Sequence, residues 1–474
     1  MSSVASTSAR AVDLAAATTL GPAPAPHKPG TIFPVEPTAA RETQSYDFVA
    51  ERTRSVCPSC TRVLEAEHVV RGDAVYMLKE CPEHGRFDLF ITRDQQFFRS
   101  VRELSLVPDD PSLKAPRFED FQRLRSIWID VTDACNMACP NCFTDAKFKA
   151  TREPDLNLLL ERLRAIPGRK PVVYAIGGEP TLRKDLVPFL ATLIREGFIV
   201  KLETNGIRLV DEDYCRELKQ AGLEWVYLQW DSLHEPTLTK LRARPMLDVR
   251  RRALENCIRY GFKVLLACMI ERGENDDQIE ELLEFARRTP QVFTVSLLPS
   301  SRLGRNELTR PEDTLTAVDV IHEVERFSKG QIRREDFLWF LRVFRLLHRV
   351  TGNPDYRPRS CILHLAYYHD GDRLVPLNRL LNPLTLARNW RAIPRLWPLA
   401  RSFFRVDKVP YLPHLSFVVI EDFLDRPTID LREASNCDKA YLTEDGYSLV
   451  CSYNAMERTG AAVEASSSTA AAPC

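Results

Sequence analysis

The sequence predicts an α/β fold, in which a partial (β/α)6 barrel lies between a small N-terminal metal-binding unit and a C-terminal α+β extension. Short apolar or β-branched runs alternate six times with helix-like stretches in the middle of the chain, which is typical of parallel strands joined by helices. Cysteines gather in short motifs before, within and after this pattern. We therefore expect a leader (1–45), a metal-binding domain (46–105), the barrel (120–306), an extension that could hold an auxiliary cluster (307–455) and a tail (456–474).

The barrel is predicted by polar residues rather than by periodicity, because six strand–helix units also fit a doubly wound sheet. A distinctive polar group follows each of the first strands, beginning with "DACNMACPNC", "GGEP", "ETNG" and "QWDS". Functional groups at the carboxyl ends of successive strands are what a barrel-type active site requires.

The two ends of the chain are rich in Ala, Ser, Thr and Pro, a composition that does not form a packed core. We expect both to be disordered and do not expect Cys474 to be a ligand. No apolar run reaches transmembrane length, and the start of the chain lacks the pattern of a signal peptide. The sequence thus predicts a cytoplasmic protein.

Composition excludes several other classes. The 474 residues include 65 basic and 65 acidic side chains, and this balance argues against a nucleic-acid partner. The 13 cysteines occur in a chain too long to need disulfide bonds for stability. Patterned cysteines in such a chain indicate metal binding or catalysis.

The N-terminal unit offers four metal ligands in two turns. "CPSC" supplies Cys57 and Cys60, and "CPEHG" supplies Cys81 and His84. Four soft or borderline ligands predict a closed structural site for zinc, or for iron as in rubredoxin.

A second cysteine group, Cys135, Cys139 and Cys142, has the spacing C-x3-C-x2-C after the first strand of the barrel. Three thiolates this close together can converge on one inorganic centre. On a four-iron cluster they would leave one iron open to a small molecule, as reactive metal sites require. The residues alone also allow a zinc site that a distant residue completes.

These motifs, in this order, resemble those of the radical S-adenosylmethionine (SAM) enzymes. The resemblance implies a partial barrel whose three loop cysteines bind a [4Fe–4S] cluster, with SAM on the remaining iron. It also implies SAM or substrate contacts at the next strand ends. The residues at these positions are Gly177, Gly178, Glu179, Thr204, Asn205, Gln229 and Asp231.

The resemblance further implies the chemistry. One electron from a donor of the flavodoxin or ferredoxin type would cleave SAM to methionine and a 5′-deoxyadenosyl radical. That radical would abstract hydrogen from an unactivated carbon. Arg305, in "LGR", could pair with the SAM carboxylate or cap the barrel.

Over roughly residues 50–455 the set of motifs is similar to the tetraether lipid synthase group, which includes proteins earlier described as pterin methyltransferases. The similarity implies carbon–carbon bond formation on a lipid or another hydrophobic substrate. An alternative is radical methylation of a pterin-like small molecule. A different class of function is a non-catalytic protein that binds an iron–sulfur cluster or zinc.

The remaining cysteines allow several interpretations. Cys361, Cys437 and Cys451 follow the barrel and could hold an auxiliary iron–sulfur cluster, or be buried apolar residues. Cys268, on the fifth strand, could point into the barrel as a further ligand. We expect Cys215 and Cys257, on amphipathic helices, to lie in the core.

Residues 373–406 are rich in Arg, Trp, Leu and Phe and contain no acidic residue. Such a segment can lie on an anionic membrane surface. Its internal prolines favour the alternative, a broken helical cover packed on the barrel.

Overall fold

The computed structural model describes residues 45–105, 120–306, 313–402 and 411–458, together with Pro37, Phe118 and Leu308. The predicted leader and tail lie almost entirely outside the described residues, and so does Cys474.

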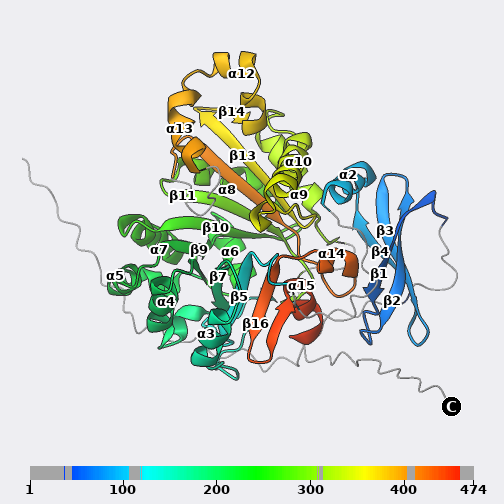
Figure 1. The fold of residues 1–474 in the computed structure, drawn as a ribbon, viewed down its shortest axis with the longest axis horizontal. Helices are drawn as coiled ribbons and strands as arrows, with labels where there is room; N and C mark the ends of the chain where they lie inside the picture. The colour runs from blue at the N-terminus through cyan, green and yellow to red at the C-terminus, as the bar shows by residue number, and fades with distance from the viewer. Residues whose placement is uncertain are drawn as a thin grey trace, which may run out of the picture.

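The centre of the molecule is an eleven-stranded sheet in the order β14-β13-β15-β11-β10-β9-β8-β7-β5-β16-β17 (Figure 1). Its middle consists of parallel strands, which confirms the α/β prediction. These strands are β5 (Ser126–Thr132), β7 (Val172–Gly177), β8 (Val200–Thr204), β9 (Trp225–Gln229), β10 (Lys263–Ile270) and β11 (Val292–Pro299).

Amphipathic helices follow these strands and pack on the outer face of the sheet. They are α3 (Leu156–Arg164), α4 (Leu186–Arg195), α5 (Glu212–Gln220), α7 (Leu247–Arg259) and α8 (Ile279–Arg288). Helix α6 (Glu235–Arg242) lies against the cysteine loop instead, where Leu238 packs with Cys135 and Met137. Aspartates cap some of them, as when Asp211 accepts from the Asp213 amide at the start of α5, which satisfies a helix N–H that has no partner within the helix. The large apolar core between sheet and helices contains Cys215 and Cys257, as expected.

The expectation that Cys268 could point into the barrel as a further ligand is wrong. It lies in this outer core and is 0% exposed, whereas its neighbours Ala267 and Met269 line the inner cavity. Because successive side chains of a strand point to opposite faces, Cys268 points away from the barrel interior and is not a ligand there.

The C-terminal extension adds strands to both edges of the parallel sheet. β15 (Leu415–Glu421) runs parallel to β11, and β16 (Lys439–Thr443) runs parallel to β5. The Lys439 ammonium donates to Glu421 Oε2 at 2.7 Å, so the two added strands approach each other and the sheet curls. Antiparallel strands β13 (Ile362–Asp370), β14 (Arg373–Pro376) and β17 (Gly446–Leu449) complete the edges. Over the described ranges β14 and β17 do not pair, so the barrel remains partial.

The extension also contributes helices, two of which join the outer core of the sheet through side chains such as Ile321 and Phe337. α9 (Ala317–Phe327) and α10 (Arg334–Thr351) precede β13, and α11 (Leu377–Leu380), α12 (Pro383–Arg388) and α13 (Ala392–Ser402) follow β14. The last two lie at one end of the molecule (Figure 1). In the part of the chain that the structure describes, no helix has the length and apolar character needed to cross a membrane.

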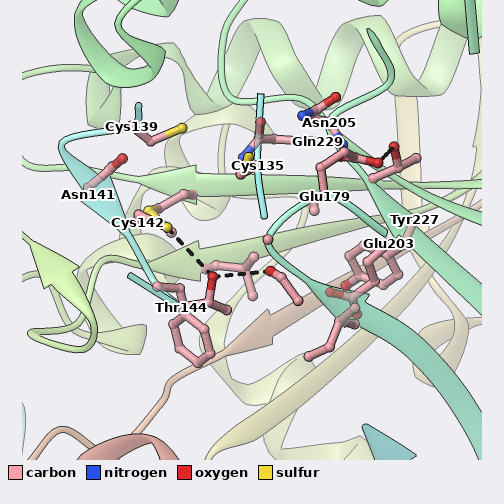
Figure 2. Close-up of a pocket in the computed structure, with 18 of the residues that line it drawn as sticks. Cys135, Cys139, Asn141, Cys142, Thr144, Glu179, Glu203, Asn205, Tyr227 and Gln229 are labelled. Atoms are coloured by element: carbon pink, nitrogen blue, oxygen red, sulfur yellow. Dashed lines mark hydrogen bonds between the residues drawn. The ribbon is translucent and has the colours of Figure 1, made fainter. Parts of the chain in front are cut away.

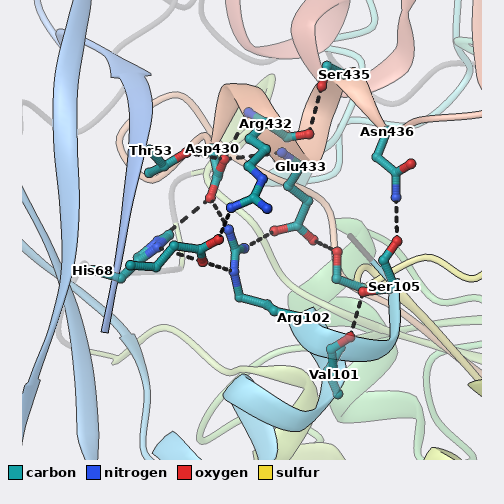
Figure 3. Close-up of polar contacts among 12 residues, drawn as sticks. Thr53, His68, Val101, Arg102, Ser105, Asp430, Arg432, Glu433, Ser435 and Asn436 are labelled. Atoms are coloured by element: carbon teal, nitrogen blue, oxygen red, sulfur yellow. Dashed lines mark hydrogen bonds and ion pairs between the residues drawn. The ribbon is translucent and has the colours of Figure 1, made fainter. Parts of the chain in front are cut away.

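The N-terminal domain is a four-stranded antiparallel sheet followed by α2 (Gln95–Ser105). Its strands are β1 (Phe48–Val56), β2 (Val63–Arg71), β3 (Ala74–Cys81) and β4 (Gly85–Thr92). The Arg102 guanidinium of α2 is buried against α14 (Leu431–Ser435) (Figure 3). It bonds Glu433 Oε2 in this helix at 3.0 Å, and Asp430 Oδ2, just before the helix, at 2.6 Å. Charged groups with well-formed partners thus join this domain to the extension.

Candidate functional site

The cysteine triplet opens on a cavity of about 210 Å³ at the carboxyl ends of the parallel strands. Cys135, Cys139 and Cys142 line its upper part, and residues from β7, β8 and β9 line the opposite wall (Figure 2). The motifs that the sequence places at successive strand ends are therefore brought together around one space.

Two glycines allow the cysteine loop to approach β7. A Cβ on Gly177 would lie 2.2 Å from the Thr132 carbonyl oxygen, and one on Gly178 would lie 2.1 Å from that of Ala134. The amides of Gly178 and Glu179 donate to the same two carbonyls, at 2.8 and 2.7 Å. The glycine pair is thus required by close backbone contact, and it fixes the loop onto the next strand.

Glu179 connects the strand ends. Its buried carboxylate accepts from the hydroxyls of Thr181 at 2.6 Å and Thr204 at 2.7 Å, and from the Asn205 amide at 2.8 Å. Burial raises its pKa despite these bonds. The Asn205 side chain in turn donates to Asn136 Oδ1 at 2.8 Å, so the end of β8 is bonded to the cysteine loop.

The thiols of the triplet lie in a buried, electrostatically strained setting. Burial raises the pKa of Cys135, and the neighbouring Cys139, Glu179 and Cys142 raise it further. Burial also raises the pKa of Cys139, while the Arg242 guanidinium, which bonds this thiol, opposes the rise. A metal centre that binds the thiolates would relieve this repulsion, because metal binding replaces the protons.

Asp231 and Gln229 are held by two buried arginines. Arg242 donates to both oxygens of Asp231, at 2.5 and 2.8 Å, and Arg250 donates to Asp231 Oδ2 at 2.8 Å and to Gln229 Oε1 at 3.0 Å. Burial alone would raise the pKa of Asp231, but the two guanidinium groups hold it at about 2. Asp231 therefore fixes Arg242 beside Cys139.

Arg305 supports the cysteine loop from the far end of the barrel. The short strand β12 (Arg305–Asn306) pairs with β6 (Asn141–Cys142), and Arg305 Nε donates to the Cys139 carbonyl at 3.2 Å. A Cβ on Gly304 would lie 2.4 Å from the carbonyl oxygens of Cys142 and Phe143. In this geometry Arg305 braces the cysteine loop, a role that differs from both of the expected ones.

Away from the triplet the cavity has a recess lined by residues of different chemistry. Its walls include Trp128, Tyr174, Tyr227 and Phe423, and its polar groups are Glu203, Glu421 and Lys439. Glu203 and Tyr227 lie next to each other on β8 and β9 (Figure 2). This is a small aromatic chamber with charge inside it, rather than an apolar channel.

The N-terminal motifs also converge. Ligand atoms of Cys57, Cys60, Cys81 and His84 all lie within 4.8 Å of one another. The Cys60 and Cys81 sulfurs are 3.8 Å apart, which equals the edge of a tetrahedron with Zn–S bonds of about 2.3 Å. Within the described ranges this is the one group of three or more such side chains that could hold a single ion. The triplet is spaced more widely, as suits thiolates that bind different irons of a cluster.

Cys361, Cys437 and Cys451 approach from three segments of the extension. Burial raises the pKa of each thiol, and Cys451 and Cys437 contribute to the rise at Cys361. The three are thus neighbours, although they do not form a group that could hold one ion.

Several residues at the site carried no recognisable signal in the sequence. Arg242 lies in an ordinary helix, and Glu421 and Lys439 lie in the extension, more than 200 residues beyond Glu203. The alternation of side chains along a strand could have placed Glu203 and Tyr227 on the inner face of the barrel. No short sequence pattern shows that β15 and β16 lie next to them.

Comparison with known proteins agrees with this geometry. Residues 129–286 match the radical SAM superfamily, and residues 49–93 match the HMPTM N-terminal zinc ribbon domain. The chain is 33% identical over 310 residues to the 7,8-dihydro-6-hydroxymethylpterin dimethyltransferase of Methanocaldococcus jannaschii, a match that covers 60% of each chain. It is 34% identical to the GTP 3′,8-cyclase of Nautilia profundicola, over 35% of this chain and 54% of the cyclase.

Among solved structures, anSMEcpe with bound AdoMet is similar at 20% sequence identity, with a TM-score of 0.36 over 48% of this chain and 66% of that one. The curated relatives are thus matched over only part of their length, whereas both domain matches coincide with the two cysteine sites. The chain therefore carries a radical SAM domain behind an N-terminal zinc ribbon domain.

Proposed function

We propose that this protein is a radical SAM methyltransferase that modifies an unactivated carbon of a small polar heterocycle of the pterin kind. The observation that carries the proposal is the cavity that joins the cysteine triplet to the recess containing Glu203, Glu421 and Lys439. The similarity to a pterin dimethyltransferase supports both the methyl transfer and the class of substrate.

In this proposal Cys135, Cys139 and Cys142 hold a [4Fe–4S] cluster, and SAM binds its remaining iron. Residues assigned to the SAM side of the cavity are Gly177, Gly178, Glu179, Thr204, Asn205, Gln229 and Asp231, all of which line it. When both are bound, the cluster and SAM would supply reductive cleavage of SAM to a 5′-deoxyadenosyl radical that abstracts hydrogen from carbon. We expect the electron to come from a flavodoxin or ferredoxin.

The chain's own residues hold the walls of the cavity in place and compensate the charge of a buried thiolate. Glu179 fixes Thr204 and Asn205, and Asn205 is bonded to the cysteine loop, so both walls of the cavity keep one geometry. Arg242 places a positive charge beside Cys139, where a thiolate ligand would otherwise lie buried without compensation. The aromatic walls keep water from the reacting carbon.

A lipid substrate, which the sequence favours, is the second candidate. The recess argues against it, because alkyl chains would leave its carboxyl and ammonium groups buried without new partners. A different surface favours it. Among the eleven strongly exposed large apolar side chains of the described residues, five lie on or beside α12 and α13: Leu381, Leu384, Trp390, Ile393 and Trp397.

These exposed side chains support peripheral contact with an anionic membrane from the cytoplasmic side. Residues 377–402 contain five arginines and no acid, and cationic amphipathic surfaces bind such membranes. Sedimentation with anionic and neutral vesicles tests this contact. We expect binding to anionic vesicles only, and weaker binding after Trp390→Ser with Trp397→Ser.

We propose that the N-terminal site binds zinc. We also propose that Cys361, Cys437 and Cys451 hold an auxiliary iron–sulfur cluster. Zinc, iron and sulfide analysis per chain tests both. Four irons and one zinc would exclude the auxiliary cluster, and about eight irons would support it.

The decisive experiment is anaerobic reconstitution with a strong reductant, SAM and a reduced hydroxymethylpterin. With SAM in excess, a second SAM would give its methyl group to the carbon radical and the reductant would supply one further electron. We expect 5′-deoxyadenosine, S-adenosylhomocysteine and a pterin that is heavier by one or more methyl groups. Cleavage of SAM without pterin methylation, together with an altered lipid profile in a deletion strain, would favour the lipid candidate. A fully loaded protein that cleaves no SAM would favour the non-catalytic class.

A further inference from the structure

Glu203 is an ionisable group inside the barrel whose carboxyl has no partner among the described residues. Its side chain is half-buried on β8 and lines the cavity beside Tyr227 (Figure 2). Its carboxyl has no hydrogen bond and no ion pair with any of the described residues, whereas Glu179, on the preceding motif, accepts four. Because polar groups in protein interiors are almost always paired, the partner of Glu203 should arrive from the cavity.

The charges around Glu203 are engaged with other groups. Lys439 of β16 bonds Glu421 of β15 at 2.7 Å, and Arg458 pairs with Asp130 of β5 at 2.8 Å. The Lys201 ammonium, on the same strand, lies over the rings of Tyr174 and Trp225, at 5.2 and 5.1 Å from their centres. Of the nearby phenols, Tyr441 accepts from Arg458 at 2.6 Å. Among the described residues, none of these cations forms an ion pair with Glu203.

This setting favours the neutral form of the carboxyl. Burial raises the pKa of Glu203 to about 8, with a further contribution from Glu421 that Lys439 and Lys201 only partly offset. A neutral carboxyl presents one O–H donor and one C=O acceptor side by side. The complementary edge on a ligand is a ring nitrogen beside an amino group, N=C–NH₂.

The walls define the rest of the ligand. Trp128, Tyr174 and Tyr227 surround the carboxyl with aromatic surface, which suits a flat ring. The whole cavity is about 210 Å³, which is small for a ligand site, and SAM would take part of it.

Resting on the function proposed above, we propose that Glu203 is the residue that selects the substrate, by pairing with the N=C–NH₂ edge of a planar nitrogen heterocycle. The pair places the ring against Tyr227 and below the cysteine triplet. The interaction is one of recognition, and no bond of the substrate is made or broken by Glu203.

The test is equilibrium binding to the anaerobically reconstituted holoenzyme with SAM and without reductant, so that no turnover occurs. The two probes are 6-hydroxymethylpterin and 6-hydroxymethyllumazine, in which oxygen replaces the amino group of the recognised edge. Wild type should bind the pterin at least about tenfold more tightly, since a site with an unpaired polar group rejects the mismatched ligand. Equal binding of the two probes would overturn the proposal without any variant.

Two substitutions at the same position sharpen the result. Glu203→Gln keeps one donor and one acceptor and should retain the preference, whereas Glu203→Leu should lose it. Wild-type affinity for the pterin should fall as pH rises through about 8 and the carboxyl loses its proton, and Glu203→Gln should not show this component. Any change in the protonation of the pterin itself affects wild type and Glu203→Gln equally, so the difference between the two pH profiles reports the Glu203 carboxyl. Glu224→Gln, an exposed carboxylate paired with Lys263, is the control.

These outcomes distinguish a failure of the Glu203 assignment from a failure of the proposed function. If wild type binds with the expected preference but cleaves no SAM under reductant, the proposed enzyme activity fails and the recognition by Glu203 stands. If it cleaves SAM and the Glu203→Leu variant still prefers the pterin, the assignment of Glu203 fails and the enzyme activity stands.

Discussion

The two cysteine groups of this protein are built in opposite ways. In the N-terminal domain, three thiols and an imidazole enclose a point from two tight turns, with their ligand atoms within 4.8 Å of one another. In the barrel, three thiols lie around the upper wall of a cavity, and no fourth ligand from the described residues completes the set. A closed group can stabilise a fold, whereas a group with an open side can bring a ligand to a metal centre.

The two cysteine groups also differ in how their surroundings shift the thiol pKa values. Burial would raise the pKa of Cys81, but hydrogen bonds from His84 and from nearby amides lower it to about 6. In the triplet, burial raises the pKa of Cys135, and the other thiols add to the rise. Burial raises the pKa of Cys60 in the same N-terminal group, so its turns favour one thiolate, at Cys81, before an ion binds. The barrel site depends on the centre that it binds and on Arg242.

Cys139→Ala should have the largest effect on SAM cleavage, because two thiolates do not retain a four-iron cluster in an open site. We expect iron to fall by about four atoms per chain and cleavage to fall by roughly 10³-fold or more, while zinc remains. Cys257→Ala, in the outer core, is the matched control and should keep both metals. Iron content that is unchanged in Cys139→Ala would show that the triplet is not the cluster site.

Gly178→Ala should come next, because it adds one methyl group where the Ala134 carbonyl oxygen already lies 2.1 Å from the Cβ position. The cysteine loop must move, and we expect cluster loading and cleavage to fall by about tenfold, since sites displaced by an ångström lose most of their rate. Gly261→Ala is a strict control. Its backbone has φ of +69° but its Cβ would meet nothing within 4 Å, so it carries strain without a clash and should load iron normally.

Arg305→Gln should have a smaller effect. The guanidinium bonds the Cys139 carbonyl at 3.2 Å and Asp145 Oδ1 at 3.3 Å, and losing such contacts costs about 0.5–1.5 kcal/mol. We expect three- to tenfold slower cleavage, a faster loss of iron in air and partial recovery with Arg305→Lys. If SAM affinity falls while the rate of iron loss stays constant, Arg305 contacts SAM rather than the loop.

The sequence predicts the cysteine groups better than it predicts their surroundings. The thiols of each site, and the strand ends at Gly177 and Thr204, belong to short motifs whose local spacing is fixed by one turn or one strand. The contacts that tune them are distant in the chain, as with Glu421 and Lys439. Such pairs depend on β15 and β16 joining opposite edges of the sheet, and no local pattern encodes that arrangement.

Cys268 illustrates a second reason. Its strand was predicted, but the face that it occupies depends on register, and a shift of one residue exchanges the inner and outer faces. Only the packed structure shows that Ala267 and Met269 face the cavity. The same parity places Glu203 inside, where its carboxyl can meet a ligand.

Cys81→Ser should have the smallest effect on cleavage and the clearest effect on the other site. The variant removes a thiol that is 3.5 Å from His84 Nδ1 and 3.8 Å from the Cys60 sulfur, so zinc should be lost and the turns before β2 and β4 should become sensitive to protease. Because distant sites act independently, cleavage should fall by no more than about threefold, with iron unchanged. Glu80→Gln, on the exposed face of the same strand, should change neither metal. A loss of cleavage as large as that of Cys139→Ala would mean that the closed site holds part of the open one in place, through Arg102 and α14, and the separation of the two roles would fail.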